Sequence, residues 1–184
     1  MAVLKSSHVL IAGTGRAGTS FLMQLLTNLE FETGFTRGVK LDSKCNAGLE
    51  SNLSNYKHWP YIVKNPEFSF QLDRIRKKVD IDFIIIPVRE SERVAQSRER
   101  VGKGNGGFWK TSSYEGQMGV NSLVYQSLTE DLTKYKIPHM YLWFDDMITD
   151  MDYLYNCLSF IFDINYNKFE REYRSLVDIN KINF

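Results

Sequence analysis

Short apolar runs alternate with longer, helix-like stretches along this chain. Residues 8–12 and 82–88 are apolar at nearly every position, as strands are when helices cover both faces of a parallel sheet. Similar runs at 61–63 and 140–144 predict two more strands. Helices are predicted over residues 19–29, 68–79, 91–100, 120–135 and 154–162. The alternation predicts an α/β fold in one domain, residues 1–184, whose central parallel sheet has helices on both faces.

Three glycines separate the first predicted strand from the first predicted helix. Gly13, Gly15 and Gly18 permit a tight turn whose backbone amides can approach an anion. The helix that follows has Thr19 or Ser20 at its start, and a helix N-terminus favours negative charge. Strand, glycine loop and helix together predict a phosphate-binding loop, and with it a three-layer P-loop NTPase-like fold.

The position of the cation decides which kind of phosphate loop this is. A Walker loop reads G-x-x-x-x-G-K-[ST], with its Lys after the last glycine. Here Thr19 occupies that position, and Arg16 supplies a cation inside the loop. Two other interpretations stay open at this point: a kinase or ATPase with an altered Walker loop, and a glycine turn that binds no ligand.

The pattern G-x-x-R-x-G-T-S resembles the 5′-phosphosulfate loop of sulfotransferases that use 3′-phosphoadenosine 5′-phosphosulfate (PAPS). Arg89 ends a predicted strand and Ser97 follows eight residues later, which is similar to the family's 3′-phosphate site. Arg93 and Arg98 either assist that site or are solvated charges on the same helix.

Weaker elements of the same family follow in the expected order. Lys64-Asn65-Pro66 resembles its Lys-x-Pro element. Residues 46–50, Asn-Ala-Gly-Leu-Glu, resemble in shortened form its Asn-x-Gly-x-x-Glu-like or Asn-Pro-x-Gly-x-x-Glu element, within a segment, 30–50, that otherwise predicts mostly loop. Residues 144–147 resemble a Tyr-Glu-Asp-Leu element. The basic Arg-Lys-Gly loop that closes over PAPS in eukaryotic cytosolic members is missing, so what covers the adenine is unassigned.

The resemblance implies a sulfotransferase that moves the sulfuryl group from PAPS to a hydroxyl or amine, leaving adenosine 3′,5′-bisphosphate. It implies that the 5′-phosphate is held by the loop and helix start, namely Gly15, Arg16, Ala17, Gly18, Thr19 and Ser20. Phe21 would lie against the adenine, and Arg89 with Ser97 would bind the 3′-phosphate. Arg16 would neutralise charge on the sulfuryl group, and Lys64 would be a second cation there. The resemblance implies no metal.

The residue that activates the acceptor has three candidates. Glu50 is the first, because it lies in one of the family-like elements. His58 is the second, because imidazole suits proton transfer near neutral pH. Glu67, just after the Lys-x-Pro element, is the third. Each of these side chains has an ordinary surface role as its alternative.

Composition excludes some classes of binding partner but says little about the chemistry of the site. The formal net charge of +1 gives no electrostatic case for nucleic acid, and no apolar run approaches the about 20 residues that cross a bilayer. Cys45 and Cys157 fit no metal spacing, and as free thiols they favour the cytoplasm. Residues 102–107 are glycine-rich and predict either a mobile lid or a surface linker.

The acceptor is expected to be a small molecule, a carbohydrate or a lipid, and the sequence does not indicate the oligomeric state. The alternatives to a sulfotransferase are a small-molecule or nucleoside kinase and a non-catalytic nucleotide-binding module.

Overall fold

A parallel sheet of four strands lies at the centre of the molecule. The structure is a computed structural model that describes residues 6–42, 46–103 and 106–177. The strands lie in the order β2-β1-β3-β4, and all neighbouring pairs are parallel. They are β1 (Ser7–Ile11), β2 (Ile62–Lys64), β3 (Asp80–Val88) and β4 (His139–Trp143). The α/β prediction with a parallel central sheet is confirmed.

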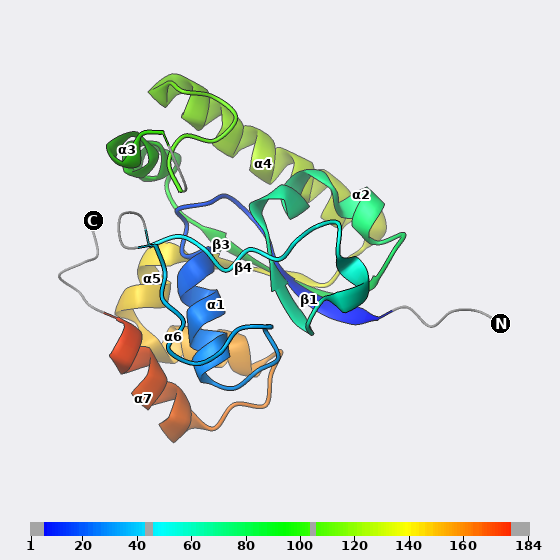
Figure 1. The fold of residues 1–184 in the computed structure, drawn as a ribbon, viewed down its shortest axis with the longest axis vertical. Helices are drawn as coiled ribbons and strands as arrows, with labels where there is room; N and C mark the ends of the chain where they lie inside the picture. The colour runs from blue at the N-terminus through cyan, green and yellow to red at the C-terminus, as the bar shows by residue number, and fades with distance from the viewer. Residues whose placement is uncertain (1–5, 43–45, 104–105, 178–184) are drawn as a thin grey trace.

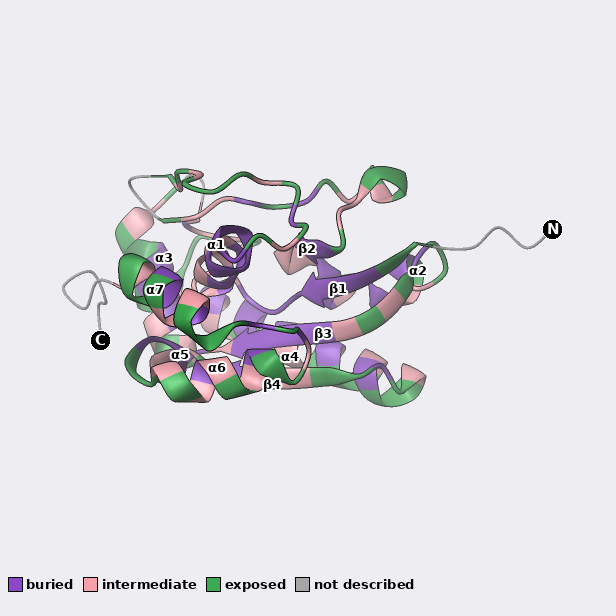
Figure 2. Ribbon diagram, turned by 90° about the horizontal axis from the view of Figure 1, so that it is seen from below, coloured by how far each residue is buried: buried purple, intermediate pink, exposed green. Residues whose placement is uncertain are grey.

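The central part of the sheet is buried on both faces because helices cover both sides of it (Figure 2), whereas the edge strand β4 leaves three of its five residues exposed. In β1, Val9 and Ile11 belong to one hydrophobic cluster, whereas Leu10 belongs to the other. This division follows from the alternation of side chains along a strand. It explains why the central strands read as continuous apolar runs rather than as alternating ones.

The helices form the two outer layers (Figure 1). One hydrophobic cluster joins the sheet to α1 (Thr19–Asn28), α5 (Phe144–Thr149), α6 (Met151–Ser159) and α7 (Tyr166–Leu176). The other joins it to the 3₁₀ helix η2 (Pro66–Phe70), α2 (Leu72–Ile75) and α4 (Tyr114–Tyr135). α3 (Ser91–Val101) packs on α4, and η1 (Tyr56–His58) is a short 3₁₀ turn.

Three helix predictions need correction. The helix expected over 120–135 is α4, which already starts at Tyr114 because the side chain of Ser113 caps the amide of Gly116. The helix expected over 68–79 is divided into η2 and the four-residue α2, and β3 begins at Asp80 directly afterwards. The helix expected over 154–162 is α6, which starts earlier because the side chain of Asp150 caps the amide of Tyr153. Two further helices, α5 and α7, were not predicted.

The connection between α1 and β2 carries no sheet or α-helical structure in its described part, as expected for most of 30–50. Cys45 lies outside the described residues, and Cys157 is a half-buried free thiol. None of the helices within the described ranges is both long enough and apolar enough to cross a bilayer.

The parallel arrangement brings three chain segments to one edge of the sheet. The glycine loop follows β1, Lys64 ends β2, and Arg89 follows β3. In open α/β sheets this carboxyl edge is where ligands bind. The fold therefore gathers the candidate residues before any side-chain detail is considered.

Candidate anion-binding site

The glycine loop has the backbone geometry that the sequence predicts. Gly13 and Gly18 have φ of 104° and 92°, a region that L-residues rarely adopt. The amide of Gly13 donates to Ser69 Oγ (3.1 Å), which fixes the start of the loop on η2. Gly18 precedes α1, and no side chain among the described residues caps that helix. The first-turn amides of α1 are therefore left to other acceptors, such as a bound anion.

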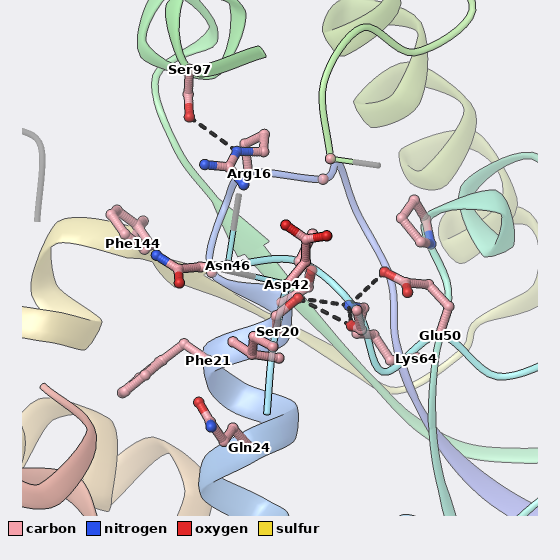
Figure 3. Close-up of a pocket in the computed structure, with 18 of the residues that line it drawn as sticks. Arg16, Ser20, Phe21, Gln24, Asp42, Asn46, Glu50, Lys64, Ser97 and Phe144 are labelled. Atoms are coloured by element: carbon pink, nitrogen blue, oxygen red, sulfur yellow. Dashed lines mark hydrogen bonds and ion pairs between the residues drawn. The ribbon is translucent and has the colours of Figure 1, made fainter. Parts of the chain in front are cut away.

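Arg16 connects the loop to the neighbouring strand and helix (Figure 3). Its φ of 73° lies in the left-handed region, and its Nε donates to Ser97 Oγ at 3.0 Å. Its carbonyl accepts from Nη1 of Arg89 at 3.3 Å. A strained conformation in a non-glycine residue persists only where the surroundings hold it. Here β3 and α3 supply those contacts.

Arg89 is buried at the end of β3. Its guanidinium lies over the ring of Phe144, 4.4 Å from the centroid. Burial lowers the pKa of Arg89 from its ordinary value, and the nearby carboxylate of Asp145 opposes that effect. Ser97, expected beside Arg89, lines the same cavity and accepts its hydrogen bond from Arg16.

Lys64 is almost fully buried, with 1% of its side chain exposed. Its Nζ donates to Ser20 Oγ (2.8 Å), to Glu50 Oε1 (2.9 Å) and to the carbonyl of Gly48. Burial lowers the pKa of Lys64, and the attraction of Glu50 partly offsets this. Figure 3 shows the amine between Ser20 and Glu50. Because 43% of the Glu50 side chain is exposed, that carboxylate stays open to a ligand.

These groups line one cavity of about 1180 Å³. Six cationic side chains and two carboxylates are among the described residues that line it: Arg16, Lys40, Lys64, Arg89, Arg98, Arg100, Asp42 and Glu50. The cavity thus carries a local excess of positive charge that the net charge of +1 conceals. Such a cavity favours a polyanionic ligand.

The predicted site residues divide into those that reach the cavity and those that do not. The cavity is lined by Gly15, Arg16, Gly18, Thr19, Ser20, Phe21, Glu50, Lys64, Arg89 and Ser97. Ala17 is fully buried and is not among the described lining residues.

His58 is a sequence candidate that the fold does not bring to the cavity. It is exposed in η1 and is not among the described lining residues. The next residue, Trp59, packs edge-on against His8 and Phe68, which anchors this turn away from the loop. Glu67 also stays out of the described lining, since Trp109 Nε1 and Lys110 bind its carboxylate.

Some lining residues were not singled out from the sequence. The sequence allows Arg98 either a binding role or a solvated one, because helical spacing alone does not show that it points inward. Residues 175–177 reach the cavity at the end of an unpredicted helix, and residues 38–42 reach it from a loop. Gly106 to Trp109 line it too, whereas residues 104–105 of the expected lid lie outside the described part.

A search of the described residues for three or more clustered His, Cys, Asp or Glu side chains finds no group that could hold a metal ion. The expectation that no metal is required stays a prediction.

Comparison with known proteins gives a fold but no family. No protein-family model matches the chain, and no curated protein sequence does. Among solved structures, the fold is similar to that of the sulfotransferase domain from the Synechococcus PCC 7002 olefin synthase. The TM-score is 0.57 at 14% identity, covering 94% of this chain and 79% of that chain. At this identity the likeness shows a shared α/β fold.

Proposed function

We propose that this protein is a sulfotransferase that moves the sulfuryl group of PAPS to a hydroxyl or amine of an acceptor. The observation that carries the proposal is Arg16, a loop cation in the same cavity as Arg89, Ser97 and Lys64. A Walker loop would have its cation at position 19, which is Thr here. The fold shared with a sulfotransferase domain supports the same proposal.

The charges of the cavity suit the phosphates of PAPS. Amides of residues 15–20, with the hydroxyls of Thr19 and Ser20, would hold the 5′-phosphate at the start of α1. Arg89 and Ser97 would bind the 3′-phosphate, which ATP lacks. Ser97 already accepts from Arg16, and its own hydroxyl proton is the donor it would offer.

Two further groups would act on the rest of the co-substrate. Phe21 lines the cavity and packs edge-on against Tyr173, with 6.2 Å between ring centroids, and its ring would lie against the adenine. Arg16 and Lys64 would stabilise negative charge on the sulfuryl oxygens and on the leaving phosphate.

Transfer needs one proton to leave the acceptor. The acceptor oxygen or nitrogen forms a bond to sulfur while the bond from sulfur to the bridging phosphate oxygen breaks. Glu50, the one carboxylate among the three sequence candidates that lines the cavity, would take the proton. Lys64 holds that carboxylate at 2.9 Å, so it would fix the direction in which Glu50 faces the acceptor.

Calorimetric titration with adenosine 3′,5′-bisphosphate, and with ATP plus magnesium, tests the proposal. We expect the bisphosphate to bind more tightly than ATP and without a metal. Arg89→Ala should weaken the bisphosphate by about tenfold or more, since charged hydrogen bonds contribute about 1.5–3 kcal/mol. Arg74→Ala, an exposed arginine outside the described lining of the cavity, is the matched control and should bind normally.

Two results would contradict this assignment. Tighter binding of ATP with magnesium would favour a kinase. Bisphosphate binding without sulfation of any acceptor in a screen with PAPS would favour a nucleotide-binding module.

A further inference from the structure

Arg98, in the middle of α3, is a buried cation directly behind the loop. Only 1% of it is exposed. Its Nη1 donates to Gln117 Oε1, and its Nη2 donates to Thr14 Oγ1 and to the carbonyl of Gly15 (3.2 Å). These hydrogen-bond partners, all within the described residues, are neutral groups.

Burying a charged guanidinium costs free energy, because the group loses its hydration. Neutral hydrogen-bond partners compensate for that loss less well than a carboxylate would. Burial and the nearby Arg16 lower the pKa of Arg98 to about 10, so the group stays charged at neutral pH. A surface arginine would bring the same charge at a far lower cost. The buried position therefore points to a role that depends on where the group lies.

The first thing that Arg98 fixes is the first half of the loop. It binds the side chain of Thr14 and the carbonyl of Gly15, both on the side of the loop that faces α3 and α4. The hydroxyl of Thr14 in turn donates to Asn121 Oδ1 (2.8 Å), and Asn121 Nδ2 donates to the Ser91 carbonyl (3.3 Å). With these acceptors turned toward the helices, the amides that follow in the loop are left for the cavity.

Arg98 also holds the segment that leads into α4. Gln117, the partner of Nη1, donates from Nε2 to the carbonyls of Trp109 (3.0 Å) and Thr111 (2.6 Å). The ring of Trp109 lies 5.3 Å from the guanidinium carbon of Arg98. One side chain thus contacts both the loop and, through Gln117, the 106–113 segment, which supplies part of the cavity wall.

We propose that Arg98 is a positioning residue for anion binding: it orients the loop through Thr14 and Gly15 and holds the 106–113 segment in register with it through Gln117. The inference rests on the proposed function only in that the loop binds an anion. It needs neither a particular nucleotide nor an acceptor.

The test compares Arg98→Lys with the wild type. Lysine keeps the charge but has no fork with which to reach Thr14, Gly15 and Gln117 together. We expect about tenfold weaker binding of both inorganic pyrophosphate and adenosine 3′,5′-bisphosphate, with an unchanged salt dependence. Amide hydrogen exchange should rise in residues 13–20 and 106–113 and not in β3 or α6. Arg74→Lys is the control and should match the wild type in each measurement.

Two milder variants keep the inference falsifiable if Arg98→Lys does not fold. Thr14→Val should raise exchange in residues 13–20, and Gln117→Met should raise it first in residues 106–113. Each should weaken pyrophosphate binding. Normal affinity in a folded Arg98→Lys protein, or in both milder variants, would overturn the inference, as would a wild type that binds neither anion.

The outcomes separate this inference from the proposed function. If pyrophosphate binds and depends on Arg98 while ATP is preferred over the bisphosphate, the positioning role stands and the sulfotransferase assignment fails. If the bisphosphate is preferred and Arg98→Lys leaves its affinity unchanged, the assignment stands and the positioning role fails.

Discussion

Glycine at position 18 is required by its surroundings as well as by its backbone. A Cβ built there would lie 2.7 Å from Cδ2 of Phe144 and 3.3 Å from Cε of Met147, and φ is 92°. At Gly15 a Cβ would meet only Nη2 of Arg98, at 3.7 Å, and the backbone is not in the left-handed region. The two glycines of one loop therefore differ in what they tolerate.

We predict that Gly18→Ala lowers the free energy of unfolding by about 1–3 kcal/mol, because the new methyl group adds a clash to an unfavourable φ. Gly15→Ala should change it by less than about 1 kcal/mol. Urea unfolding of both variants measures the difference. Equal losses at the two positions would contradict the described loop conformation.

Lys64 gives a prediction for pH. Its pKa is lowered in the folded protein, mainly by burial, from an ordinary value of 10.5. Between the lowered pKa and 10.5 the unfolded chain binds more protons at this site, so the Lys64 contribution to stability rises with pH across that window. Below the window the full cost of burying the charged amine remains.

The measurement is the unfolding free energy of the wild type relative to Lys64→Met, followed as pH is raised toward 10.5. We expect the difference to move in favour of the wild type. Glu50→Gln should make the rise begin at lower pH, because Glu50 holds the Lys64 pKa up. A difference that falls over this range would show that the amine is not buried as described.

At the scale of elements, the C-terminal helix is joined to the loop after α1 by a buried carboxylate. Glu172 in α7 has 1% of its side chain exposed and accepts from Nη2 of Arg37 at 2.8 and 3.0 Å, and from Arg171 Nε at 3.0 Å. Arg37 itself is 57% exposed. The contact fixes α7 beside the 38–42 loop, and both supply part of the cavity wall.

We predict that Arg37→Met destabilises the protein by about 1–2 kcal/mol, because it takes a charged partner from a buried carboxylate. Arg174→Met, which removes an exposed helical pair with Glu170, should cost less than about 0.5 kcal/mol. Thermal and urea unfolding of the two variants compare the effects. A cost no greater for Arg37 than for Arg174 would mean that Glu172 is adequately held by Arg171.

The elements predicted best from the sequence are the four strands, whose conformation follows from their own residues. The strands are apolar enough to require a covered sheet, and each was predicted within two residues of its observed bounds. The periodicity of 68–79 was misleading because Asn65 caps η2 and β3 begins at Asp80, which leaves α2 only four residues. Helix α7 could have been predicted, because Phe169, Tyr173 and Leu176 recur at helical spacing among charged residues; only the burial of Glu172 could not be foreseen, since it depends on Arg37, far away in the sequence.

The same distinction holds for the site. Arg16, Lys64 and Arg89 could be placed at the carboxyl edge because each ends or follows a strand, whereas their binding roles stay predictions. Arg98 could not be assigned, since its burial depends on Thr14 and Gln117, which lie far away in the sequence. Nor could the position of His58 outside the cavity be predicted, because the packing of Trp59 that anchors its turn involves His8, far away in the sequence, as well as the nearer Phe68.

At the scale of the whole molecule, the cavity is built from residues between Gly15 and Val177, almost the full described length of the chain. Folding is therefore what gathers its cationic side chains in one place. Neither the first half of the chain nor the second carries all of them.

The place of β1 in the sheet has a kinetic consequence. Both of its neighbours come later in the chain: Val9 pairs with Ile62 and with Phe83. Closing these long intervals costs chain entropy before any pairing compensates for it, so we expect the sheet to nucleate slowly. The loop after β1 reaches its final shape only when β3, α3 and α4 are in place around it. We therefore expect a ligand of that loop to slow unfolding more than it speeds folding, because the contacts that it stabilises need all of these elements in place.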